Sequence, residues 1–243
     1  MVGKKLVRKA LNNNQKINNQ SNSLKNKFIL KNKSEIKLIM FDYDGTIMDT
    51  FLLSCHVYNR IFKEFNIEKE FTKRQFQELF ETDWREALKK LNLITKEQWD
   101  RCGEIYNEHT ADYEDDFRCY PHIEEILEQL HKKYILAIVS NGNKKNIASK
   151  LKKCNLLQYF DYISGYEQGE KPSPKPLLKC MNKLNIKPEQ SIYIGDMDGD
   201  IVAGKAAKVN TVIAVTYGYH HHTRLQDADV IIHKPEELLN IFM

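Results

Sequence analysis

The feature that most constrains this chain is an apolar run, Ile36–Phe41, that ends in Asp42-Tyr43-Asp44-Gly45. A run of branched apolar residues that stops at a turn predicts a buried strand of a parallel sheet. Because side chains two residues apart in an extended chain point the same way, Asp42 and Asp44 should face one point beyond the strand's carboxyl end. Ligands of open α/β sheets bind at that edge, so the segment marks a candidate site.

The two aspartates themselves narrow the chemistry. Carboxylates held this close repel each other, which raises one pKa unless a cation lies between them. The pair therefore indicates a Mg²⁺ site, a nucleophile beside a protonated acid, or both. A loop with two solvated aspartates is the alternative, and three further motifs downstream argue against it.

The second and third motifs supply groups for an anion. Ser140-Asn141-Gly142 follows the predicted strand Ile135–Val139, and a hydroxyl and backbone N–H groups beside a helix N-terminus suit a phosphate. Serine and asparagine are also ordinary turn and cap residues. Lys171 lies in a proline-rich segment, where a positioned ammonium can hold an anionic ligand and stabilise transition-state charge. A solvated proline-rich loop is the alternative there.

The fourth motif repeats the first one further along the chain. The predicted strand Ile192–Gly195 is followed by Asp196, and Asp200 comes four residues later at the start of a helix predicted over Asp200–Ala207. Both carboxylates can face the cleft, and hard oxygen ligands of this kind suit Mg²⁺. A calcium loop is excluded because no glutamate closes the 12-residue pattern. Nucleophile, metal ligands, cationic clamp and anion cradle are together the parts of phosphoryl transfer.

The order of helical and strand patterns predicts the architecture. From residue 121 onward helices and strands alternate, which predicts an α/β fold with a doubly wound, Rossmann-like parallel sheet. Residues 51–118 contain only helical patterns, with Asp49 as a candidate N-cap for the first helix, and predict an inserted all-helical cap domain. The expected core domain is therefore residues 35–50 and 119–243. Further strands are expected near Tyr162–Gly165, Thr211–Val215 and Val230–Ile232.

Residues 1–34 differ in composition from the rest. They hold nine Lys or Arg and no acid, so the other 28 basic residues face 33 acidic ones and leave the body at about −5. With few apolar residues, this tail is expected to be disordered or a frayed helix. Its contact with nucleic acid or an anionic surface is disfavoured, although a transit-peptide role would place the protein in an organelle.

Cysteine usage and hydropathy indicate the compartment. The five cysteines include no Cys-x-x-Cys pair, which fits a reducing environment and favours a cytoplasmic protein. No apolar run approaches the roughly 18 residues of a membrane span, so none is expected. The oligomeric state is left open by the sequence.

The four motifs, in this order, resemble the haloacid dehalogenase-like hydrolase superfamily over about residues 36–243. The helical insertion after the first motif is similar to the family's helical-cap subgroup. Asp200–Ala207 and Thr216–Tyr219 are similar to its phosphoglycolate phosphatase-like members. His122 is a departure, since it follows Pro121 where family members often have glycine.

The resemblance implies roles for the acidic residues. Asp42 would attack phosphorus to form an aspartyl-phosphate, and Asp44 would protonate the leaving oxygen and later activate water. Mg²⁺ would be held by Asp42, the backbone carbonyl of Asp44, and Asp196. Asp200 would support the metal or Lys171 from behind.

The resemblance also implies how substrate is held. Lys171 would offset charge on Asp42 and on the phosphoryl group, and Arg85 in the cap is a candidate contact for a substrate anion. The alternative is that Arg85 is a solvated residue at the start of a helix that Thr82 or Asp83 caps. The phosphoryl oxygens would be held by Thr46, Ser140, Asn141, Gly142 and Lys171.

These roles predict a Mg²⁺-dependent phosphatase acting on a small phosphorylated metabolite. Phosphoglycolate is the leading substrate, with pyrophosphate, a sugar phosphate or a nucleotide monophosphate as rivals. An aspartate at position 44 favours phosphate chemistry over carbon–halogen cleavage. A phosphomutase of the β-phosphoglucomutase type and a non-catalytic binding protein are the alternatives of a different kind.

Overall fold

A six-stranded parallel sheet forms the centre of the molecule in the computed structural model, which describes residues 33–112 and 118–243. Its order is β3-β2-β1-β4-β5-β6, so β1 lies in the middle and the strand order reverses beside it. In such sheets the crevice at the reversal binds ligands. The strands are β1 (Leu38–Phe41), β2 (Ile135–Val139), β3 (Tyr162–Ser164), β4 (Ser191–Gly195), β5 (Thr211–Val215) and β6 (Val230–Ile232).

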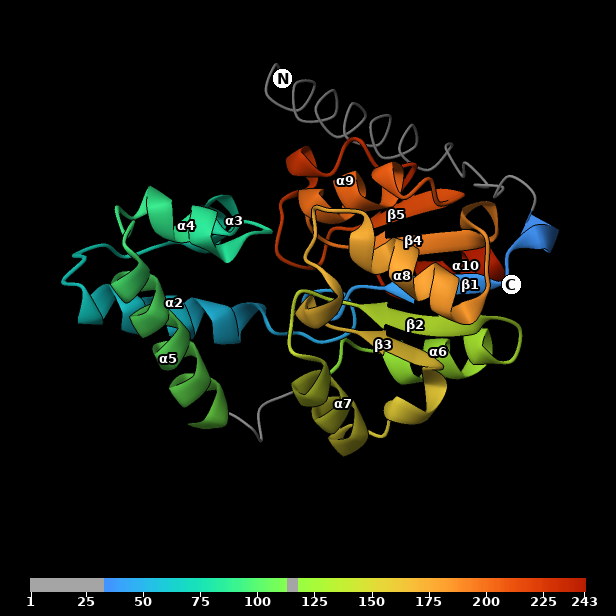
Figure 1. The fold of residues 1–243 in the computed structure, drawn as a ribbon, viewed down its shortest axis with the longest axis horizontal. Coiled ribbons are helices and arrows are strands. Elements are labelled where there is room, and N and C mark those ends of the chain that lie inside the picture. Colours follow the sequence, from blue (N-terminus) through green and yellow to red (C-terminus); the bar gives the residue numbers. More distant parts are fainter. Residues whose placement is uncertain (1–32, 113–117) are drawn as a thin grey trace, which may run out of the picture.

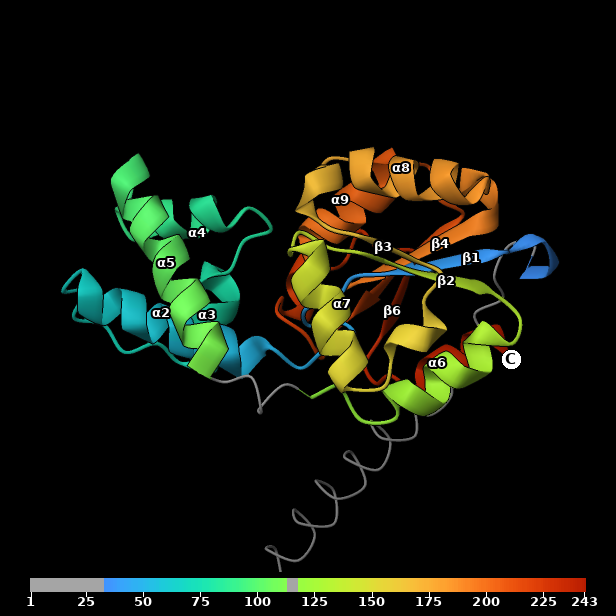
Figure 2. The ribbon, with the colours of Figure 1, turned by 60° about the horizontal axis from the view of Figure 1, so that its bottom comes forward.

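Helices cover both faces of this sheet (Figure 1; Figure 2). Helices α6 (Ile123–His131), α7 (Lys144–Lys153) and α10 (Glu237–Phe242) share one apolar cluster with one face. Helices α8 (Lys175–Leu184) and α9 (Asp198–Ala206) pack against the other. The predicted doubly wound α/β fold is confirmed.

The apolar spacing of α6 illustrates why these segments are helical. Ile123, Ile126, Leu127 and Leu130 are at most 1% exposed and fall on one helical face. Burial of each such side chain contributes about 1.5–3 kcal/mol. The helix begins after His122, whose φ of 64° is left-handed and would suit glycine better.

Four helices between β1 and α6 lie to one side of the sheet (Figure 1). They share an apolar cluster of their own, rich in aromatic rings. This cluster supports the cap domain 51–118 and the split core 35–50 and 119–243, which we propose as the domain boundaries. The helices are α2 (Phe51–Glu64), α3 (Lys73–Leu79), α4 (Trp84–Lys90) and α5 (Lys96–Asp112).

One core residue joins the cap cluster. The Tyr219 ring lies 5.5 Å from the Phe51 ring and 5.0 Å from the Phe80 ring, centroid to centroid. Aromatic pairs at such distances add to the stability that burial already provides. The loop after β5 therefore takes part in the packing of the cap.

Two details of the helix ends differ from the sequence-based expectation. The N-cap of α2 is Thr50, without a side-chain capping bond, and Asp49 is exposed. Helix α9 begins at Asp198 rather than Asp200, because the Asp200 carboxylate reaches back to the preceding backbone N–H groups. The basic tail lies outside the described residues, apart from Lys33 and Ser34.

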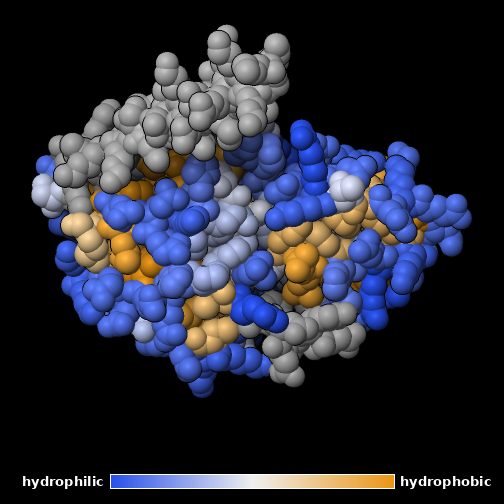
Figure 3. Space-filling model, turned by 180° about the vertical axis from the view of Figure 1, so that it is seen from behind, coloured by the Kyte–Doolittle hydropathy of each residue, from blue (hydrophilic) through white to orange (hydrophobic). Residues whose placement is uncertain are grey.

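The surface seen from behind is mainly hydrophilic, with separate apolar areas on the core and on the cap (Figure 3). Within residues 33–112 and 118–243, every helix is too short or too polar to cross a bilayer.

Candidate active site

The predicted site residues converge at the carboxyl edge of the sheet. Asp42 follows β1, Ser140 follows β2, and Asp196 follows β4. Lys171 comes from the loop after β3, and Asp200 from the first turn of α9. All five are buried, with exposed fractions of at most 6%.

Lys171 lies at the centre of this group. Its Nζ is 2.7 Å from Asp42 Oδ1 and 2.6 Å from Asp200 Oδ1. It also donates a hydrogen bond to the Tyr193 hydroxyl, at 2.9 Å. Burial lowers the pKa of Lys171, but the neighbouring Asp200 and Asp42 carboxylates outweigh it and raise the pKa overall. The ammonium therefore stays charged at neutral pH.

The carboxylates themselves are not fully compensated. Burial raises the pKa of Asp42 to about 7; Lys171 opposes this rise, and the Asp200 carboxylate adds to it. Burial, Asp42 and Asp200 likewise raise the pKa of Asp196 well above its usual value. Lys171 stabilises the ionised form of the carboxylates beside it. Because several buried carboxylates share this one ammonium, the pKa of Asp42 nevertheless stays above its usual value. The site has an excess of negative charge.

That excess fits a divalent cation. Asp42, Asp196 and Asp200 offer oxygens that lie within 4.8 Å of one another. Hard oxygen donors of this kind suit Mg²⁺. Asp200 Oδ2 already accepts from the Asp196 and Met197 N–H groups at 3.1 and 2.9 Å, and its Oδ1 contacts Lys171. We propose Asp42 and Asp196, which directly follow β1 and β4, as the carboxylates that bind the ion, and Asp200 as a support for Lys171.

Asp44 is held by the residue that directly precedes the cap. Its Oδ1 accepts a hydrogen bond from the Thr50 hydroxyl at 2.9 Å. The Thr50 hydroxyl in turn lies 3.1 Å from the hydroxyl of Tyr219. Burial raises the pKa of Asp44, although the hydrogen bond from Thr50 opposes this shift. Asp44 is thus suited to carry a proton beside the site.

Two side chains predicted to bind phosphate, those of Asn141 and Thr46, also hold other residues of the site. Asn141 Oδ1 accepts from the Lys171 N–H at 2.7 Å, and Asn141 Nδ2 donates to the Lys171 carbonyl at 3.0 Å. Thr46 Oγ1 donates to Asp196 Oδ1 at 3.1 Å. Asn141 thereby positions Lys171, and Thr46 orients Asp196. Ser140 Oγ accepts from the Gly142 N–H at 3.0 Å, so this turn is held by its own hydrogen bond.

Arg85 lies at the boundary between cap and core. Its Nη1 is 3.2 Å from Asp83 Oδ1 and 3.6 Å from Glu170 Oε2. Its guanidinium also lies 4.8 Å from the centre of the Trp84 ring. Asp83 caps α4 by accepting from the Arg85 N–H, as the alternative interpretation of this segment expected, but Arg85 itself is paired with acidic side chains rather than solvated. The Arg85 side chain therefore lies beside Glu170, the residue that precedes Lys171.

Gly45 allows two of these loops to approach each other. Its φ is +74°, and a Cβ there would lie 2.2 Å from Asp196 Oδ2. Any other residue would strain the backbone and displace the carboxylate. Glycine is thus needed at position 45, because the first motif passes very close to Asp196 of the fourth motif.

Three positioning residues were not predicted from the sequence. The Tyr193 hydroxyl contacts Lys171 and Asp200, and the Tyr219 N–H donates to Asp196 Oδ2 at 2.6 Å. Thr50 holds Asp44. Tyr193 lies two residues before the end of a buried strand that leads to a carboxylate, and this was the one available signal for it.

Comparison with known proteins identifies the class. The family model described as haloacid dehalogenase-like hydrolase matches residues 39–214. Pyrophosphatase PpaX of Oceanobacillus iheyensis is 30% identical over 212 residues, covering 85% of this chain and 96% of that protein. Phosphoglycolate phosphatase of Aquifex aeolicus is 31% identical over 211 residues, with the same coverage.

A solved structure shares this fold. A solved haloacid dehalogenase-like hydrolase from Streptococcus pneumoniae superposes with a TM-score of 0.76 at 24% identity, covering 86% of this chain and 100% of that one. The chain belongs to the haloacid dehalogenase-like hydrolase family, as its four motifs indicated.

Proposed function

We propose that the protein is a Mg²⁺-dependent phosphatase that hydrolyses a small phosphorylated metabolite through an aspartyl-phosphate on Asp42. The observation that carries this proposal is the Asp42 carboxylate, held 2.7 Å from the Lys171 ammonium at the switch point of the sheet. Asp44 lies two residues further on and has a raised pKa. Nucleophile, cation and proton donor are thus gathered at one edge.

The reaction follows from these positions. The Asp42 carboxylate attacks phosphorus, and the bond from phosphorus to the leaving oxygen breaks as that oxygen takes the Asp44 proton. Asp44, now ionised, accepts a proton from water, which attacks the phosphorus of the aspartyl-phosphate and frees Asp42 and phosphate. Lys171 stabilises negative charge in both steps. A bound Mg²⁺, with Asp42, Asp196 and the Asp44 carbonyl as its proposed ligands, would supply further positive charge.

Phosphoglycolate is the leading substrate in this proposal, with pyrophosphate second. Relatives named for each of these activities match at 31% and 30% identity over 85% of the chain. Sugar phosphates and nucleotide monophosphates complete the panel to test. Arg85 would contact the anionic end of the substrate, so Arg85→Ala should raise KM for the preferred compound.

The alternatives are separated by the product. Free phosphate supports the phosphatase, whereas an isomerised phosphate ester without free phosphate supports a mutase. A protein that binds but converts none of the panel would be the non-catalytic alternative, which the intact set of site residues argues against. We place the enzyme in the cytoplasm, with an organelle as the alternative.

The role of Asp44 can be tested with leaving groups. Asp44→Asn should lose most activity on a substrate with a poor leaving group, such as phosphoglycolate. A good leaving group needs no proton, so p-nitrophenyl phosphate should still phosphorylate Asp42. The second step then lacks its base, and we expect about one nitrophenol per enzyme followed by a stall. Rapid-quench kinetics and mass spectrometry of the phosphorylated peptide would check this. Equal losses on both esters would contradict the acid role.

Metal and pH should act together on stability. Without metal, Asp42 binds a proton in the folded protein but not in the unfolded chain between the ordinary aspartate pKa of 3.8 and its folded-state pKa of about 7. Stability should therefore fall as pH rises through this window. Mg²⁺ needs ionised carboxylates, so it should raise Tm more at pH 8 than at pH 5. Calorimetry with Mg²⁺ and with EDTA tests this. A Mg²⁺ effect that shrinks as pH rises would contradict it, and EDTA should also abolish turnover.

A further inference from the structure

A network of polar contacts joins the cap to the core outside the catalytic cluster. On the cap side lies the loop between α3 and α4, with Phe80, Glu81 and Thr82. On the core side lie Asp198, His220 and Arg224. We call these six residues the cap latch.

Arg224 makes contacts on both sides of this boundary. Its Nη1 donates to the Phe80 carbonyl at 3.1 Å, and its Nη2 to Glu81 Oε2 at 2.7 Å. Its Nε donates to Asp198 Oδ2 at 3.0 Å. The side chain is 27% exposed, so water screens these charges only in part. One guanidinium thus ties two cap residues to the first turn of α9.

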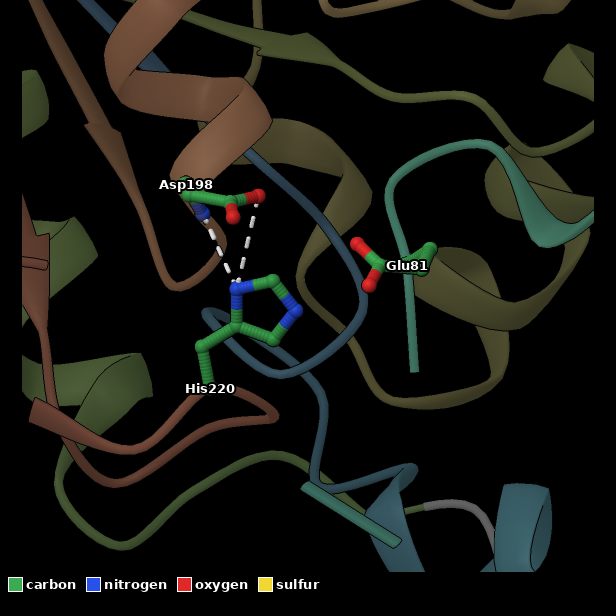
Figure 4. Close-up of side chains that lie close together, drawn as sticks. All are labelled: Glu81, Asp198 and His220. Atoms are coloured by element: carbon green, nitrogen blue, oxygen red, sulfur yellow. Dashed lines mark hydrogen bonds and ion pairs between the residues drawn. The ribbon is translucent and has the colours of Figure 1, made fainter. Parts of the chain in front are cut away.

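His220 also contacts both the cap side and the core side of the latch. It is fully buried; its Nδ1 accepts from the Asp198 N–H at 3.1 Å, and its Nε2 donates to the Phe80 carbonyl at 3.0 Å. Figure 4 shows the ring next to Asp198, with Glu81 approaching from the cap loop. These three side chains could suggest a metal site. Both ring nitrogens are already used, however, and Arg224 supplies the positive charge, so the cluster is a polar junction.

Shape supports the same contact. The Gly199 N–H donates to Thr82 Oγ1 at 3.2 Å. A Cβ at Gly199 would lie 2.2 Å from Thr82 Oγ1, and 2.6 Å from Thr82 Cβ. Glycine is therefore the residue that lets the cap loop reach the start of α9.

The latch is connected to the catalytic lysine. Asn141 Nδ2 donates to the Thr82 carbonyl at 3.2 Å and also to the Lys171 carbonyl at 3.0 Å. The amide that positions Lys171 therefore also binds the cap loop. Release of the loop would remove one of the contacts that fix this amide.

We propose that Arg224 is a positioning residue that latches the Phe80–Asp83 loop onto the core and thereby holds the cap closed over the site. A latched cap limits substrates to small phosphate esters and keeps Asn141 aligned with Lys171. The first part concerns the cap position alone, whereas the substrate limit rests on the proposed phosphatase function.

The cap position is tested without any turnover. Spin labels carried by unnatural amino acids at Ile94 in the cap and Val202 in α9, both well exposed, report the distance between the two parts. Arg224→Ala should lengthen and broaden this distance distribution, and Arg224→Lys should do so less. Arg101→Ala is the matched control, because Arg101 pairs with Glu64 and Glu104 inside the cap. A distribution unchanged by Arg224→Ala would overturn the latch.

A second pair of variants approaches the latch through shape. Gly199→Ala should also open the cap, because its methyl group collides with the Thr82 side chain. When Thr82→Gly is already present, the same substitution should have little further effect on the distance. A full effect of Gly199→Ala in both backgrounds would show that this contact does not hold the cap.

Selectivity is the functional readout. The ratio of kcat/KM for p-nitrophenyl phosphate to that for phosphoglycolate should rise at least about tenfold in Arg224→Ala, since loss of a charged hydrogen bond shifts a closing equilibrium by about that much. An unchanged ratio beside an opened cap would overturn the substrate limit. If the wild-type enzyme converts no member of the substrate panel, the proposed function fails, while the distance measurement still decides the latch.

Discussion

Asp42→Asn should release phosphate at least about 10⁴-fold more slowly than the wild-type enzyme, because the amide cannot attack phosphorus. The substitution preserves shape and removes a buried carboxylate that resists ionisation. Lys171 keeps its contact with Asp200, so the fold should persist. Phosphate release from the substrate panel, measured beside Tm, checks both statements.

The control for this result is stability. We expect the Tm of Asp42→Asn to equal or exceed that of the wild-type protein when EDTA is present, since one of several repelling carboxylates is gone. An inactive variant that has also unfolded would say nothing about the nucleophile. Full activity in a folded variant would eliminate the aspartyl-phosphate mechanism.

Lys171→Met should reduce both stability and catalysis. Removal of the ammonium leaves Asp42 and Asp200 buried without their shared partner, and breaking a buried ion pair in this way costs about 3–5 kcal/mol. Loss of the cation beside the phosphoryl group should lower kcat by about 10²–10³-fold in protein that remains folded. Urea unfolding and steady-state kinetics measure the two effects.

Mg²⁺ and a conservative variant separate these effects. Added Mg²⁺ should restore much of the stability of Lys171→Met, because it offsets the same carboxylates, but it should not restore kcat. Lys171→Arg keeps the charge in a bulkier group, so it should lose less stability than Lys171→Met. Wild-type stability in metal-free Lys171→Met would contradict the charge balance described for the site.

The sheet and its carboxylates could be predicted from the sequence because their signals are local. Most strands of the core are short, largely apolar runs; Asp42 and Asp196 directly follow β1 and β4, and Asp44 comes two residues after Asp42. The carboxyl ends of parallel strands meet at one edge, so chain order alone brings these residues together. Helix ends were less predictable. The Asp200 carboxylate accepts from the Met197 N–H and so extends α9 toward its N-terminus, and helix propensity does not account for such a contact.

The remaining contacts depend on residues far apart in the chain. His220 lies 140 residues from Phe80, and Asn141 lies 30 from Lys171. An asparagine after a strand indicates a cap, a turn or an anion contact equally well, and only the tertiary structure selects among them. Arg224 had no pattern around it that pointed to the cap.

Tyr219 has a consequence for how the cap could be exchanged. Its N–H holds Asp196, its hydroxyl contacts Thr50, and its ring lies in the aromatic cluster of the cap. An excised cap would lack one ring of its own interior, and a cap transplanted from a relative would meet a foreign side chain at this position. Evolution could therefore replace the cap of such an enzyme only together with the loop after β5, so the two segments should vary as one inherited unit.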